Sequence, residues 1–129
     1  MIVLDTHVWL WWVSDPQKLG EAAREALDRA DEVGICTISC WEVAMLSLRG
    51  RIQLDREIEA WVGQALAHPR ATALPLTAPV ATRVALLEDE GFPGDPADRI
   101  IYATARAEGS RLLTRDADIQ EFDPRLAIW

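Results

Sequence analysis

The segment Ile2-Val3-Leu4-Asp5-Thr6 decides the fold class of this chain. Three apolar residues in a row are typical of a strand buried on both faces of a parallel sheet. The acid and the hydroxyl residue end this run, and residues 7–13, with three tryptophans, are expected to turn directly into a short helix. A buried strand that leads into a helix opens a β–α–β unit. The segment therefore predicts an α/β protein.

The rest of the chain repeats this alternation of short apolar runs and amphipathic segments. Further strands are expected at residues 33–38, 71–76 and 111–114, with a last edge strand at 126–129. Helices are expected between them, starting at capping residues: Asp15 before Pro16, Ser39, Asp55, Thr77, Asp95 before Pro96, and Asp116. Strands that alternate with helices predict a mostly parallel sheet covered by helices on both faces.

Length and composition restrict the class of protein. A chain of 129 residues, half of them apolar, predicts one domain over residues 1–129 with its own core. No apolar run approaches the roughly 20 residues of a membrane span, and the first ten residues lack the basic start of a signal peptide. Cys36 and Cys40 are too few for a disulfide framework and are not spaced with His7 and His68 as zinc ligands. We expect core thiols and a cytoplasmic protein with no membrane association.

The net charge restricts function further. There are 21 acidic and 13 basic residues, which gives −8. A chain this acidic does not coat nucleic acid without regard to sequence, because such binding needs a dense basic surface.

Four acids nevertheless stand where a parallel sheet places its functional site. Asp5 follows the first expected strand, Glu42 lies one helical turn past the second, Asp98 lies in the first turn of the helix after Asp95-Pro96, and Asp116 follows the fourth strand. The carboxyl ends of parallel strands meet at one edge of the sheet. We therefore expect these four carboxylates to face the same edge.

Each of the four acids also has a structural explanation. Asp5 and Asp116 can cap helices, and Asp98 can favour a helix dipole. Glu42 can pair with Arg49 or Arg99. Convergence of four acids from four separate strand–helix junctions by chance is far less frequent than a structural role for any one of them.

Converging carboxylates indicate a particular chemistry. Two unit charges about 5 Å apart repel by roughly 3 kcal/mol at an effective dielectric near 20, so a group of them binds protons or a cation. Oxygen ligands without thiolate or imidazole favour Mg²⁺ or Mn²⁺. Such an ion activates water and stabilises a leaving oxygen in phosphate chemistry. The acids therefore favour metal-assisted hydrolysis of a phosphodiester.

The same residues carry a family resemblance. Residues 3–12 (VLDTHVWLWW), 38–43 (ISCWEV), 95–105 (DPADRIIYATA) and 113–116 (LTRD) are similar to four motifs of PIN-domain proteins, specifically the VapC-type toxins of prokaryotic toxin–antitoxin pairs. The motifs occur in order and span essentially the whole chain.

The resemblance implies a five-stranded PIN sheet, a Mg²⁺- or Mn²⁺-dependent endoribonuclease, a homodimer and a cognate VapB-type antitoxin whose C-terminal segment blocks the site. It implies that Asp5 and Asp98 are direct metal ligands. Glu42 and Asp116 would hold the metal directly or through water. The RNA substrate stays open among transfer, ribosomal and messenger RNA.

Several neighbouring residues have two interpretations each. Thr6 and Thr114 match hydroxyl positions of the family but also suit caps and backbone binding. Arg99 and Arg115 are candidates for contacting substrate phosphate or orienting a carboxylate. Asp95 is expected to cap a helix and is a weaker candidate for the metal, while Asp118 is expected in solvent and His7 is expected to pack on its helix. One or two of the tryptophans Trp9, Trp11 and Trp12 are expected to be exposed at a protein interface.

Other functions remain as alternatives. A noncatalytic PIN-like module that binds partners is disfavoured because all four acids are present. A PIN nuclease of RNA processing outside a toxin–antitoxin pair remains open. A receiver-like phosphoacceptor domain needs a lysine near the last strand, whereas the single lysine is Lys18. No G-x-G-x-x-G follows the first strand, which argues against dinucleotide binding.

Overall fold

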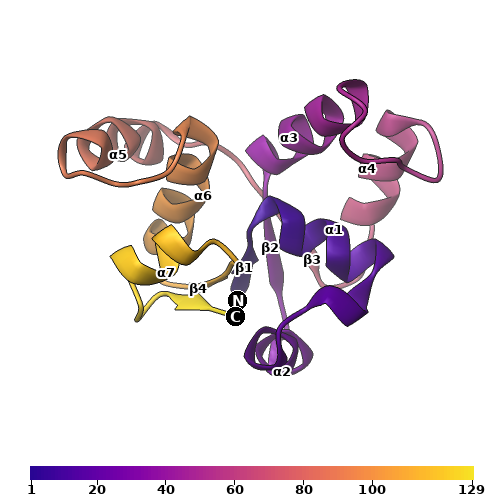
Figure 1. Ribbon diagram of the computed structural model, residues 1–129, viewed down its shortest axis with the longest axis horizontal. Coiled ribbons are helices and arrows are strands. Elements are labelled where there is room, and N and C mark those ends of the chain that lie inside the picture. The colour runs from indigo at the N-terminus through magenta and orange to yellow at the C-terminus, as the bar shows by residue number, and fades with distance from the viewer.

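The protein is built around a central parallel sheet (Figure 1). The computed structural model describes all residues, 1–129. The strands lie in the order β3-β2-β1-β4-β5, and every neighbouring pair is parallel. Their bounds are β1 Ile2–Leu4, β2 Val33–Cys36, β3 Ala71–Leu74, β4 Arg111–Leu113 and β5 Ala127–Ile128. The expected α/β fold is confirmed, and the sheet expected to be mostly parallel is parallel throughout.

Helices cover both faces of this sheet. Figure 1 shows α1 to α4 on one side of β1 and α5 to α7 on the other. Their bounds are α1 Thr6–Ser14, α2 Glu21–Arg29, α3 Thr37–Leu48, α4 Ile58–Leu66, α5 Ala78–Asp89, α6 Pro96–Ala107 and α7 Ala117–Phe122, with a short 3₁₀ turn, η1, at Pro16–Lys18. No helix has both the length and the apolar character that crossing a membrane requires.

The alternation of side chains along β1 divides the core into two halves. Ile2 and Leu4 point into a half that α1 to α4 complete, whereas Val3 points into a half completed by α5, α6 and α7. Because both faces of β1 are covered, its three residues are all buried. This explains the uninterrupted apolar run in the sequence.

The path of the chain places a crevice at the carboxyl end of β1. From β1 the chain moves through β2 to β3 at one edge of the sheet, and then crosses through α5 and α6 to β4 on the other side of β1. Leu4 pairs in register with both Ile35 of β2 and Leu113 of β4. The residues that follow these strands therefore meet at a topological switch point, where open α/β sheets bind ligands.

Three helix starts differ from the expected ones. Asp15 makes no side-chain cap bond and begins only η1, while α2 starts after Gly20. Helix α3 begins at Thr37 directly after β2, so Ser39 lies buried inside the helix instead of capping it. The α4 cap is Glu57, which accepts from two backbone N–H groups, whereas Asp55 pairs with Arg56.

Other expected features are confirmed. Thr77 and Asp95 cap α5 and α6, each followed by proline in the first turn. Cys36 is a buried thiol and Cys40 a half-buried one. Two strands are shorter than expected. The strands expected at 33–38 and 71–76 each end two residues earlier in the structure. The first ends because α3 begins directly after it, and the second ends before Pro75, which has no N–H group to donate to a neighbouring strand.

Candidate active site

Five carboxylates line one pocket of about 430 Å³ at the carboxyl edge of the sheet. They are the four acids expected there and the acid treated as ambiguous: Asp5, Glu42, Asp98, Asp116 and Asp95. Asp5 and Asp116 follow β1 and β4, Glu42 lies on α3 after β2, and Asp95 and Asp98 lie at the start of α6, which follows α5. The chain topology therefore brings together acids that are more than one hundred residues apart.

Asp5 lies at the centre of this site, between the end of β1 and the start of α1. Its Oδ1 accepts from the backbone N–H of Thr6 at 2.8 Å, and its Oδ2 accepts from the Thr114 hydroxyl at 2.6 Å. Burial raises the pKa of Asp5, and these two hydrogen bonds oppose that shift by stabilising the charged form. Asp5 is both a helix cap and a pocket carboxylate.

Glu42 reaches the pocket from α3 and is held by Thr6. The buried Thr6 hydroxyl donates to Oε1 of Glu42 and lies 2.9 Å from the hydroxyl of Ser39. Burial raises the pKa of Glu42, the Thr6 hydrogen bond lowers it, and the charges of Asp5 and Asp95 raise it. The alternative in which Glu42 pairs with an arginine is wrong, since its partner is a hydroxyl.

Asp98 and Asp95 form a capping box at the start of α6. Asp95 Oδ1 accepts from the Asp98 backbone N–H at 2.9 Å, and Asp98 Oδ2 accepts from the Asp95 N–H at 3.3 Å. Burial, followed by the nearby charges of Asp5 and Asp95, raises the pKa of Asp98 to about 7. Asp95 therefore contributes to the site by fixing Asp98 and by adding negative charge.

Asp116 completes the pocket from the junction of β4 and α7. Its Oδ1 accepts from the backbone N–H groups of Asp118 and Ile119, so the helix-cap interpretation is confirmed for this residue too. A carboxylate has two oxygens, and capping occupies one of them. Asp118 is exposed and lies outside the pocket, as expected.

The donor chemistry of this pocket fits a hard divalent cation. Its acidic groups are oxygen ligands, and the pKa values of three of them, Asp5, Glu42 and Asp98, are raised chiefly by burial with further contributions from neighbouring charges. A bound cation relieves both costs. No three His, Cys, Asp or Glu side chains already stand in an arrangement that holds an ion. The carboxylates accept hydrogen bonds from hydroxyl and backbone donors.

Two expectations about neighbouring residues need correction, and a third is confirmed. His7 is exposed and borders the pocket, and its ring packs on its own helix, 5.9 Å from the ring of Trp11. Arg99 lies outside the pocket, where it pairs with Glu88 at 3.1 Å and donates to the carbonyl of Gly94. Trp9 is fully buried, whereas Trp11 and Trp12 are half-buried under other side chains, so none of the three is fully exposed.

Ser39 is a polar residue of the site that the sequence interpretation missed. Its buried hydroxyl contacts Thr6, which in turn holds Glu42. The available signal was its spacing, because residues three apart on a helix lie on the same face. This role of Ser39 was missed because the residue was expected to cap the helix.

The fold and the site agree with a known family. A family model described as the PIN domain matches residues 2–124. The chain belongs to the PIN-domain family, and the resemblance carried by its four motifs is confirmed.

Individual relatives narrow the comparison. The chain is 42% identical over 130 aligned positions to Ribonuclease VapC22 of Mycobacterium tuberculosis, an alignment that covers 99% of this chain and 98% of the relative. Its fold is similar to a structure described as a toxin–antitoxin complex from Klebsiella pneumoniae, with a TM-score of 0.71, 21% identity, and coverage of 100% and 97% of the two chains. It is also similar to VapBC2 from Rickettsia felis bound to a promoter DNA fragment, with a TM-score of 0.65, 17% identity, and coverage of 99% and 98%.

Proposed function

We propose that this protein is the toxin of a type II toxin–antitoxin pair and acts as a divalent-metal-dependent endoribonuclease. The observation that carries the proposal is the single pocket lined by five carboxylates, one of which has a pKa raised to about 7. The 42% identity to a ribonuclease of the VapC type over nearly the whole length supports RNA as the substrate.

The metal ligands in this proposal are the four acids of the family motifs. Asp5 and Asp98 hold Mg²⁺ or Mn²⁺ directly, and Glu42 and Asp116 hold it directly or through water. When bound, such an ion lowers the pKa of water and offsets the charge of a phosphodiester. Thr114 and Thr6 orient Asp5 and Glu42 through their hydroxyl groups, and Asp95 orients Asp98 through the capping box.

The proposed partners are a VapB-type antitoxin and a second copy of the chain. The name of the VapC22 relative and the toxin–antitoxin descriptions of the two similar structures support the antitoxin. Trp41 and Leu48 of α3 are exposed apolar residues, which is consistent with a protein interface. The RNA target and the cytoplasmic location stay predictions.

Cleavage of single-stranded or looped RNA by the purified protein tests the function. We expect cleavage with Mg²⁺ or Mn²⁺, none with chelator, and loss of cleavage in Asp5→Asn and Asp98→Asn. Asp118→Asn is the matched control, because Asp118 follows the same strand as Asp116 but is exposed outside the pocket. Full activity in Asp5→Asn, or cleavage in chelator, would overturn the metal site. A folded protein that never cleaves RNA but binds a partner would instead favour the noncatalytic alternative.

A further inference from the structure

Arg115 is the one arginine or lysine in the acid-lined pocket. It shares the pocket with five carboxylates, yet none of the ion pairs of the protein involves it. Its side chain is exposed, and the centre of its guanidinium lies 5.7 Å from the centroid of the Trp11 ring. The indole face, instead of an acid, therefore holds this cation.

Trp11 is itself fixed on two further sides. Its ring centroid lies 5.6 Å from that of Trp129, which follows β5, and 5.9 Å from that of His7. Trp129 packs closely on Gly20, where a Cβ atom would come within 2.8 Å of the Trp129 carbonyl carbon. The Trp11 ring is thus positioned by His7 of α1 and by Trp129 after β5, and its orientation does not depend on Arg115.

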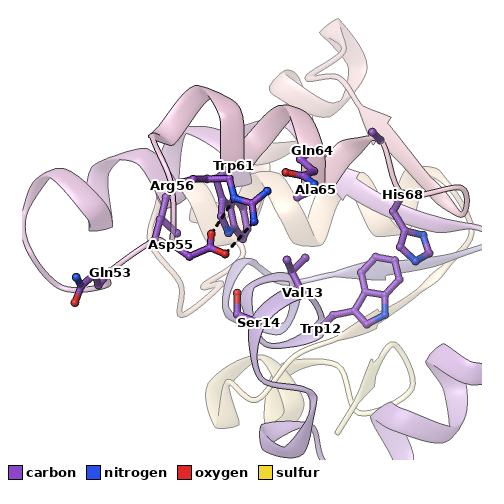
Figure 2. Close-up of a pocket in the computed structure, with 12 residues that line it drawn as sticks. Trp12, Val13, Ser14, Gln53, Asp55, Arg56, Trp61, Gln64, Ala65 and His68 are labelled. Atoms are coloured by element: carbon purple, nitrogen blue, oxygen red, sulfur yellow. Dashed lines mark hydrogen bonds and ion pairs between the residues drawn. The ribbon is translucent and has the colours of Figure 1, made fainter.

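A neighbouring pair with the same geometry shows what a structural cation–π contact looks like in this protein. The guanidinium of Arg70 lies 5.6 Å from the centroid of the Trp12 ring, but its Nη1 also donates to the carbonyls of Leu27 and Ala30 at 2.8 and 2.7 Å. Trp12 faces His68 in a separate pocket of about 740 Å³ between α1 and α4 (Figure 2). The guanidinium of Arg70 is thus bound to backbone carbonyls, whereas the N–H donors of Arg115 stay free beside the pocket acids.

We propose that Trp11 is a positioning residue that holds Arg115 at the acid-lined pocket, and that Arg115 binds a phosphate of the RNA backbone beside the bond that is cut. This rests on the proposed ribonuclease function. A guanidinium that is held by an aromatic face retains its planar set of N–H donors, which match phosphate oxygens in pairs. A salt bridge to a pocket carboxylate would occupy those donors.

The test compares RNA affinity and its salt dependence among variants. The probe is a short fluorescein-labelled single-stranded RNA of mixed sequence, with Ca²⁺ in place of Mg²⁺ to hold back hydrolysis. Arg115→Gln is expected to weaken binding about 10-fold and to reduce the slope of log affinity against log salt by about 0.7. Trp11→Leu removes no charge, yet is expected to reduce the same slope, because the guanidinium is no longer held. The double variant is expected to equal Arg115→Gln.

Two further variants separate positioning from loss of structure. Trp11→Phe keeps an aromatic face and is expected to retain most of the slope. Trp12→Leu removes the adjacent indole and its cation–π contact and is expected to leave the slope unchanged. Equal slopes in wild type, Arg115→Gln and Trp11→Leu would overturn the inference while RNA cleavage, and with it the proposed function, stands. Absence of RNA binding by the wild-type protein would overturn both.

Discussion

The Thr114 hydroxyl donates to Oδ2 of Asp5 at 2.6 Å, joining two residues that lie 109 positions apart in the chain. Thr114 is buried directly after β4, and its Oγ1 also accepts from the backbone N–H of Asp116 at 3.0 Å. One hydroxyl thus fixes the positions of two pocket acids. This contact depends on the pairing of β1 with β4, which places the two residues within hydrogen-bond distance.

Thr114→Val should lower metal-dependent cleavage by about 10- to 100-fold, the usual cost of losing a group that orients a metal ligand. Valine has the same shape but leaves Asp5 and the Asp116 N–H without their partner. The measurement is the Mg²⁺ concentration needed for half-maximal cleavage. Thr82→Val is the control, since the exposed Thr82 hydroxyl bonds only to Ala78 of its own helix. Unchanged Mg²⁺ dependence in Thr114→Val would show that the hydroxyl does not orient the site.

The raised pKa of Asp98 predicts an unusual pH dependence of stability. Burial and the charges of Asp5 and Asp95 raise the pKa of Asp98 to about 7 in the folded protein, against about 3.9 for an unperturbed aspartate in the unfolded chain. The folded state therefore binds the extra proton between these values. The contribution of Asp98 to the free energy of unfolding falls as pH rises toward 7.

Urea unfolding without metal measures whether the free energy of unfolding falls as pH rises, as predicted. Lowering the pH from about 8 to about 5 should stabilise the wild-type protein more than Asp98→Asn. Excess Mg²⁺ should reverse the trend, because the ion binds the deprotonated carboxylate. The same pH dependence in both proteins would mean that Asp98 titrates normally.

Gly94→Ala should disrupt the site through packing. A Cβ atom at Gly94 would lie 2.6 Å from Cβ of Asp98 and 2.6 Å from the ring of Phe92. The expected cost is about 1–3 kcal/mol of stability, together with reduced cleavage because Asp98 is displaced. Gly63→Ala is the matched control, because nothing lies within 4 Å of its new Cβ on α4. There the change should be neutral or stabilise by up to about 1 kcal/mol. Thermal unfolding and cleavage rates of both variants decide the matter.

The parallel sheet and the acids at its edge were predictable because both depend on local patterns. Buried strands appear as short apolar runs, and an acid one to three residues after such a run is placed near the end of the strand. Asp5 and Asp116 illustrate this: each follows its strand and caps the next helix. Both acids cap a helix and also line the acidic pocket.

The features that sequence patterns missed depend on contacts between distant segments. Arg99 pairs with Glu88 across the loop between α5 and α6, which adjacency to Asp98 did not indicate. Helix α3 begins without a side-chain cap, because β2 leads directly into it and Ser39 is engaged by Thr6. Trp11 and Trp12 are covered by Trp129 and His68, residues from other elements. Partners of this kind are defined only once the sheet has assembled.

The central claim is that the five-carboxylate pocket binds a divalent metal, and a Mn²⁺ titration followed by electron paramagnetic resonance tests it most directly. The signal of free Mn²⁺ is lost when the ion binds protein, so the measurement needs neither RNA nor activity. We expect wild type and Asp118→Asn to bind Mn²⁺ equally, and Asp5→Asn and Asp98→Asn to lose at least about 10-fold in affinity. Equal binding by all four proteins, or no binding by the wild type, would contradict the account.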